Sequence, residues 1–88
     1  MAGAVYMTYS IYVLRSLKNN KRYIGYTGKS VDERLHEHLS GTNQWTRQNG
    51  SFVLIHTESF NEQKLAIQRE KFLKSGQGRR WLDENIRG

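Results

Sequence analysis

Cysteine is absent from the 88-residue chain, so neither a disulfide framework nor a thiolate metal site can form. A chain without cysteine suits a reducing compartment, and we predict a cytoplasmic protein. No apolar run is long enough to span a membrane. The first residues, MAGAVYMT, lack the charged start and the long apolar core of a signal peptide. These absences argue against a disulfide-stabilised scaffold and against a membrane partner.

Basic residues outnumber acidic residues in this small chain. It has 14 Lys and Arg against 8 Asp and Glu, a formal net charge of +6 and a pI near 9.9. The hydrophobic share of 36% and the charged share of 25% are typical of a folded, soluble protein with a small core. The positive field suits a polyanion, so we predict a nucleic-acid partner, although many small proteins are basic for no specific reason.

Apolar patterning predicts three strands and three helical segments. The first two strands form a hairpin around the polar loop LKNNK, and the first is apolar on both faces, which favours a central strand. The predicted strands are 9–16, 21–26 and 52–57. The predicted helices are 30–41, 61–75 and a short amphipathic segment that carries Trp81, Leu82 and Ile86. The order β-β-α-β-α-α predicts an α/β fold, a small sandwich with a three-stranded antiparallel sheet flanked by helices. We expect one domain, residues 9–88, after a disordered tail, residues 1–8.

Two serine–glutamate pairs mark the expected helix starts. Ser30 with Glu33 and Ser59 with Glu62 both have the spacing of a capping box. The segment TNQWTRQNGS, between the first helix and the third strand, is expected to be a polar loop.

Helical spacing singles out three polar residues at the rims of apolar faces. Arg34 and His38 are four apart, so they are neighbours beside an apolar stripe. That stripe is formed by Val31, Leu35 and Leu39. Glu70 lies at the rim of the apolar arc of the 61–75 helix, where a partly desolvated carboxylate needs a cation or a donor. Arg69 falls inside the same arc, where an ion pair or a snorkelling side chain would cover it. Taken singly, each residue is explained more simply by an ordinary ion pair at the core edge.

Several common catalytic arrangements are missing. No serine sits in a nucleophile motif and cysteine is absent, so a Ser-His-Asp or Cys-His nucleophile is not supported. GYTGK lacks the spacing of a Walker loop. His36 and His38 are two apart and point to different faces of their helix, which makes a histidine zinc site with His56 a weak hypothesis.

Four motifs, taken together and in order, resemble a GIY-YIG domain. They are SIY (10–12), YIG (23–25), ERLHEH (33–38) and LAIQREKFLKSGQGRRWL (65–82). The chain resembles the short, stand-alone bacterial members of that family. Members with an assigned activity are mostly nucleases that cut DNA phosphodiesters with one divalent metal. The resemblance therefore implies an endonuclease that acts on DNA with one Mg²⁺ or Mn²⁺ ion.

The same resemblance assigns roles to five residues. Tyr12 and Tyr23 match the tyrosines of the first and second motifs. Arg34 matches the helix arginine that contacts phosphate, and His38 falls where the family places a histidine or tyrosine one turn on. Glu70 matches the metal-binding glutamate. These five are the predicted catalytic residues.

Two further positions match the family less closely. Asn85 is a loose match to a family asparagine in the C-terminal part. Ser10 stands where the family has glycine. The side chain is small in both cases, so we expect the fold to be kept, and crowding by Ser10 would lower the activity.

Hydrolysis requires a base, and a free tyrosine is ionised only about one time in a thousand at pH 7. Arg34, the metal or a protonated His38 could lower the pKa of a tyrosine, whereas a neutral His38 could accept its proton. We hypothesise that Tyr12 is the base or a proton relay and that Tyr23 positions the water or the phosphate. The reverse assignment of the two tyrosines is also open.

The hairpin register provides a structural test of a shared site. Tyr12 and Tyr23 lie on one sheet face only if paired residue numbers sum to an odd value, as with Leu14 opposite Gly25. Gly25 would leave room for a backbone to come close.

Basic residues in loops and near helix ends are predicted to contact nucleic acid. They are Lys29, Arg47, Lys74, Arg79 and Arg80. Most such contacts go to phosphates and carry little sequence information, so specificity would come from nucleic-acid shape or a protein partner. Two alternatives remain: a nucleic-acid-binding module with weak or no cleavage, and a protein-interaction domain whose tyrosines are core.

Overall fold

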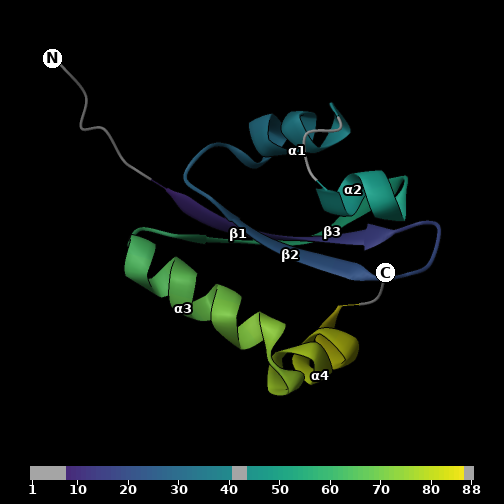
Figure 1. Ribbon diagram of the computed structural model, residues 1–88. Coiled ribbons are helices and arrows are strands. Elements are labelled where there is room, and N and C mark those ends of the chain that lie inside the picture. The colour runs from purple at the N-terminus through teal and green to yellow at the C-terminus, as the bar shows by residue number, and fades with distance from the viewer. Residues whose placement is uncertain (1–7, 41–43, 87–88) are drawn as a thin grey trace, which may run out of the picture.

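The computed structural model describes residues 8–40 and 44–86 (Figure 1). Its three strands form one antiparallel sheet in the order β2-β1-β3. They are β1 (Tyr9–Ser16), β2 (Arg22–Thr27) and β3 (Phe52–Phe60). The helices are α1 (Val31–Leu39), α2 (Gln44–Asn49), α3 (Gln63–Lys74) and α4 (Gly76–Asn85). The predicted α/β fold and its order β-β-α-β-α-α are confirmed, with α2 as an added short helix. The predicted tail lies outside the described residues except for Thr8.

The sheet separates two layers of helices. In Figure 1, α1 and α2 lie on one face, and α3 and α4 lie on the other. No helix in the described ranges, 8–40 and 44–86, is long and apolar enough to cross a membrane.

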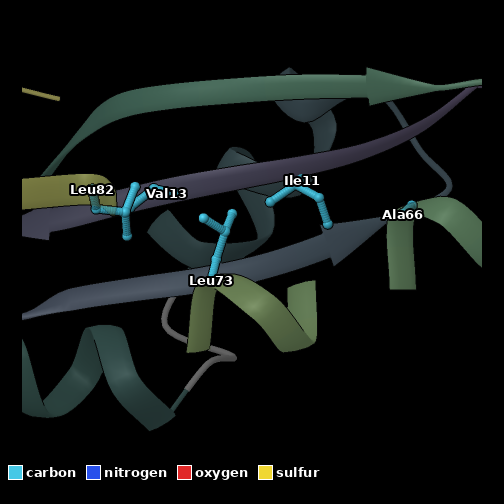
Figure 2. Packing of buried hydrophobic residues seen from close by; sticks show 5 residues of the cluster. All are labelled: Ile11, Val13, Ala66, Leu73 and Leu82. Atoms are coloured by element: carbon cyan, nitrogen blue, oxygen red, sulfur yellow. The ribbon is translucent and has the colours of Figure 1, made fainter. Parts of the chain in front are cut away.

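Strand β1 occupies the centre of the sheet, as its apolar pattern predicts. Residues 11–14 are all 0% exposed. Ile11 and Val13 pack toward α3 and α4, where Ala66, Leu73 and Leu82 complete the core cluster (Figure 2). Because side chains alternate along a strand, Tyr12 and Leu14 point to the α1 and α2 side. One strand therefore supplies both the hydrophobic core and the base of the opposite layer.

The hairpin register places both motif tyrosines on the same face. Tyr12 pairs with Gly25 and Leu14 pairs with Tyr23, so paired numbers sum to an odd value. The parity required for a shared site is therefore present, although the pairs are shifted by two residues from Leu14 opposite Gly25. Tyr23 lies diagonally across from Tyr12, within reach of an aromatic side chain.

Helix α1 starts as predicted but turns a different side inward. Ser30 is its N-cap, and its hydroxyl accepts the backbone N–H of Glu33 at 3.1 Å. His38 is the residue of α1 that is buried, whereas Leu39 is 71% exposed. The prediction that Leu39 belongs to the inward stripe is wrong, because the buried face of α1 is centred on His38. His38 packs on the rings of Tyr12 and Tyr23, while Val31 and Leu35 are half-buried.

The prediction of a polar loop before β3 is wrong for residues 44–49, which form helix α2. Side-chain bonds to the rest of the protein hold this short helix. The Thr46 hydroxyl donates to the His38 carbonyl at 3.1 Å, and the Ser16 hydroxyl donates to the Asn49 carbonyl at 2.6 Å. A helix of six residues is marginal by itself, so these tertiary bonds explain why it forms.

The second predicted capping box is also wrong. Ser59 belongs to β3, which continues to Phe60 because Ser59 and Phe60 pair with Ser10 and Tyr9. Glu62 is the N-cap of α3 and makes no side-chain cap bond. Helix α3 ends at Lys74, and Ser75 then caps α4 by accepting the backbone N–H of Gly78 at 3.2 Å.

Gly78 allows α4 to pack closely on the end of α3. A Cβ atom added at Gly78 would lie 2.0 Å from the Phe72 carbonyl oxygen and 2.4 Å from Leu73 Cα. No side chain fits this contact between backbones. Any larger residue would move α4, which carries Leu82 into the core.

Arg69 is covered by an ion pair, one of the two explanations expected for it. Its Nε and Nη2 donate to the two carboxylate oxygens of Glu58 at 2.8 and 3.1 Å. The guanidinium also lies over the rings of Trp81 and Phe72, at 4.5 and 5.0 Å from their centroids. His56 contacts the same carboxylate at 2.7 Å. This group joins β3 to α3 and α4.

Candidate functional site

Tyr12 and His38 meet beneath helix α1. The Tyr12 hydroxyl lies 2.9 Å from His38 Nε2, and the two residues are 0% and 1% exposed. The other ring nitrogen, Nδ1, is buried and has no hydrogen-bond partner within the part of the chain that the structure describes. The contact with Tyr12 is therefore the polar interaction that orients the imidazole.

Three more aromatic rings surround this pair. The Tyr23 ring lies 6.1 Å from that of Tyr12 and 5.2 Å from that of His38, measured between centroids. Trp45 of α2 packs on Tyr23 at 5.4 Å, and Phe52 packs on His38 at 6.0 Å. Tyr23 is half-buried, in contrast to Tyr12. The ring cluster thus runs from a closed interior at Tyr12 to a partly open edge at Tyr23.

Gly25 makes room for the Tyr12 ring. A Cβ atom at Gly25 would lie 2.2 Å from Tyr12 Cζ and 2.4 Å from its hydroxyl oxygen. The expectation that Gly25 admits a backbone is therefore replaced by a side-chain contact. The glycine of the YIG motif fixes where the tyrosine of the SIY motif lies.

The surroundings keep Tyr12 protonated and His38 neutral. Burial raises the pKa of Tyr12 well above its ordinary range, and Tyr23 raises it further, against a lowering effect of Arg34. Burial lowers the pKa of His38, and the positive charge of Arg34 adds to this. With the proton on Nδ1, a neutral His38 can accept the Tyr12 hydroxyl proton at Nε2.

Arg34 brings a positive charge to the same layer. Its Nη1 donates to Glu37 Oε1 at 2.7 Å, and Lys29 also pairs with Glu37. Hydrogen bonds from Lys29 and Arg34 lower the pKa of Glu37. The structure therefore brings together four of the five predicted catalytic residues, Tyr12, Tyr23, Arg34 and His38.

Glu70 lies in the other layer of helices, on α3. Its carboxylate pairs with Lys74 at 3.2 Å, and its side chain is 21% exposed. Lys74 lines a hollow of about 340 Å³ together with Tyr23, Ile24 and Arg79. Lys74, the partner of Glu70, therefore lies at the same hollow as Tyr23, whereas Glu70 itself does not line it. No group of three or more His, Asp or Glu suited to a metal occurs in residues 8–40 and 44–86.

The predicted nucleic-acid contacts fall in several places. Lys74 and Arg79 line the hollow at β2, whereas Arg47 lines a smaller one, of about 230 Å³, beside His38. Lys29 pairs with Glu37, and Arg80 is exposed on α4. These five positions stay predictions.

Asn85 stays apart from the ring cluster. Its side-chain amide donates to the Trp81 carbonyl within α4 at 2.8 Å. This bond accounts for the residue as part of the last helical turn, and the loose family match has no further support.

Apart from Arg79, the residues of a larger hollow at the same strand, of about 450 Å³, were not predicted from the sequence. Lys21, Arg22 and Trp45 line it, together with Arg79 and Asp83. A tryptophan inside an otherwise polar segment was the available signal, because tryptophan is rarely placed in a loop without packing or binding.

Comparisons with known proteins agree with the motif pattern. The model of the GIY-YIG catalytic domain matches residues 8–82. A UPF0213 protein of Natronomonas pharaonis is 39% identical over 66 residues, which cover 74% of this chain and 75% of that protein. The solution NMR structure of a UPF0213 protein from Bacillus halodurans is 32% identical with a TM-score of 0.54, and the match covers 89% and 84% of the two chains. The chain belongs to the GIY-YIG family.

Proposed function

We propose that the protein is a metal-dependent endonuclease that hydrolyses phosphodiester bonds of DNA. Membership of a family defined by a catalytic domain suggests a nuclease-type function, and the names of the UPF0213 relatives state no activity. The observation that carries the proposal is the buried hydrogen bond between Tyr12 and His38, next to the half-exposed Tyr23. This is an arrangement for moving a proton from a surface site to an interior acceptor.

Tyr23 meets the attacking water in this proposal, and Tyr12 relays the proton. Tyr12 is 0% exposed, so it does not meet solvent water. Its raised pKa also means that Tyr12 rarely loses its proton to form a phenolate. As Tyr23 takes a proton from water, it passes its own to Tyr12, whose proton moves to His38 Nε2. Neutral His38 can take this proton at Nε2, and the burial and Arg34 charge that keep it neutral also make it a weaker base than a free histidine.

Arg34 is proposed to hold the phosphate. A guanidinium donates several hydrogen bonds in a fixed geometry that matches phosphate oxygens. Its present partner, Glu37, lies on the same helix three residues on and is itself partly exposed. A phosphate could therefore share or replace this pair without unpacking the interior.

Glu70 is proposed to hold one Mg²⁺ or Mn²⁺ ion. A single partly buried carboxylate fits Mg²⁺, which keeps several waters and takes one or two protein carboxylates. When bound, such an ion polarises the phosphate and stabilises the leaving oxygen. Lys74 holds the carboxylate at 3.2 Å and would be displaced or shared.

The alternative is a nucleic-acid-binding module that cuts weakly or not at all. The Glu70–Lys74 pair favours it, because the cation already neutralises the proposed metal ligand. The raised pKa of Tyr12 also favours this alternative if Tyr12 does not take part in proton transfer.

Cleavage of a labelled DNA oligonucleotide and of plasmid, with Mg²⁺ or Mn²⁺ and with EDTA, tests the proposal. Glu70→Ala should lower metal-dependent cleavage by roughly 10²-fold or more, because a metal contributes several kcal/mol to the transition state. Glu62→Ala, at the start of the same helix, is the matched control and should cut normally. Cleavage that survives in Glu70→Ala would remove the proposed metal site, and binding without cleavage under all conditions would favour the alternative.

A further inference from the structure

We propose that the free edge of β2 is a binding track for an unpaired nucleic-acid strand, with a base stacked on Trp45 and phosphates on Lys21, Arg79 and Lys74. The inference deepens the proposed function, since it names the form of the substrate beside Tyr23. It rests on the shape and chemistry of two adjoining hollows.

The two hollows adjoin along the same strand. They measure about 450 and 340 Å³ and share Arg22, Ile24 and Arg79 in their lining. Strand β2 is an edge of the sheet, with β1 on its other side. Trp45 comes from α2 and Leu82 from α4, and these helices lie in different layers (Figure 1). Because both residues line the larger hollow, it spans the strand edge from one layer to the other. Together the two hollows form one track beside β2.

The chemistry of the track suits a strand with exposed bases. Lys21, Arg22, Lys74 and Arg79 are cationic, and the acid in the lining, Asp83, pairs with Arg22. Arg22 Nη1 is buried without a hydrogen-bond partner in the described part of the chain. Proteins that bind single strands combine such a basic groove with an aromatic side chain on which a base stacks.

The size of the track favours unpaired nucleotides over a duplex. A hollow of about 450 Å³ lies within the range of roughly 300–1,000 Å³ that is usual for small-molecule sites. It can admit a nucleotide, whereas a duplex could only lie across its mouth. In a duplex the faces of the bases are stacked on each other, so Trp45 would have no face to meet.

The track leads to the proposed catalytic site. Tyr23 lines the smaller hollow and packs on Trp45 with ring centroids 5.4 Å apart. A strand whose base lies on Trp45 would therefore place a neighbouring phosphate close to Tyr23. Lys74, in the same hollow, is the residue that pairs with Glu70.

Binding in EDTA at low salt tests the track without depending on cleavage. A labelled DNA oligonucleotide is titrated as a single strand and as a duplex, and fluorescence anisotropy gives Kd. Trp45→Leu keeps apolar bulk but loses the stacking face, so it should weaken single-strand binding by about tenfold and leave duplex binding nearly unchanged. Trp45→Phe should retain most of the affinity. Circular dichroism confirms that each variant is folded.

A charge control and a second readout complete the test. Arg79→Ala should weaken single-strand binding more than Lys64→Ala, an exposed position on α3 outside both hollows. In a Trp81→Phe protein, Trp45 is the remaining tryptophan, and its fluorescence should be quenched by the single strand. Unchanged fluorescence, or equal losses on single strand and duplex in Trp45→Leu, would overturn the track. Binding at the track without any cleavage would instead overturn the proposed function alone.

Discussion

Tyr12 and Tyr23 are the tyrosines of the SIY and YIG motifs, but the fold gives them different surroundings. Tyr12 lies on the central strand under α1 and is 0% exposed, whereas Tyr23 lies on an edge strand and borders a hollow. From the sequence, side-chain alternation could say only which hairpin register would place both on one face, and the structure has such a register. The apolar pattern of the first strand predicted its central place, but the difference in exposure also depends on α1 and α2, which cover Tyr12 and leave Tyr23 beside a hollow.

The protonation state of His38 predicts how the cleavage rate depends on pH. Its pKa is lowered by burial and by Arg34, so it stays neutral until the pH falls below the ordinary histidine range. Neutral His38 is the proposed proton acceptor, so the cleavage rate should decline only at such acidic pH. A pH–rate profile under saturating metal measures this.

His38→Gln is the matching variant, because glutamine accepts a hydrogen bond but does not titrate. It should cut roughly 10²-fold more slowly and lose the acidic decline. The same acidic decline in the variant would show that another group titrates.

At the scale of elements, the helices and strands that carry a local sequence signal were the ones predicted correctly. The cap at Ser30 and the apolar β1 identified α1 and the central strand correctly. Helix α2 has no apolar periodicity of its own and depends on the hydrogen bonds made by the Thr46 and Ser16 hydroxyls, so no local sequence pattern predicted it. An ion pair or a snorkelling side chain was expected for Arg69, but the sequence did not identify its partner, because Glu58 lies one residue beyond the predicted end of the third strand.

The Glu58–Arg69 pair should stabilise the junction of β3 with α3 and α4. Burial alone would raise the pKa of Glu58, but hydrogen bonds from Arg69 and His56 outweigh it and the pKa is lowered. A carboxyl with a lowered pKa stabilises the fold above its unfolded pKa, and this is lost as the pH falls through the folded pKa.

Glu58→Gln should therefore lower the free energy of unfolding by about 1–3 kcal/mol at neutral pH and flatten its acidic dependence. Urea denaturation at several pH values measures both effects. Glu84→Gln, an exposed position on α4, is the control and should change little. Equal stabilities of the Glu58→Gln and Glu84→Gln proteins would mean that the pair contributes nothing net.

The whole molecule keeps its core on one face of a thin sheet and the tyrosine–histidine cluster on the other, while the proposed metal ligand Glu70 lies on α3, on the core side. The face toward α3 and α4 buries Ile11, Val13 and Leu73, whereas the face toward α1 and α2 carries the tyrosine–histidine cluster. The two faces meet at the free edge of β2, where the hollows and their cations lie. The net charge of +6 predicted a polyanion partner but could not say where it binds.

The most direct test of the account compares two tyrosine variants of one strand. Tyr23→Phe removes the hydroxyl proposed to meet the water, whereas Tyr26→Phe changes a residue whose ring stacks on Tyr9 on the core face. Single-turnover cleavage of labelled single-stranded DNA with Mg²⁺ is measured for both. Tyr23→Phe should cut roughly 10²-fold or more slowly than the unchanged protein, and Tyr26→Phe should cut at a near-normal rate. Near-normal cleavage by Tyr23→Phe would contradict the proposed role of Tyr23.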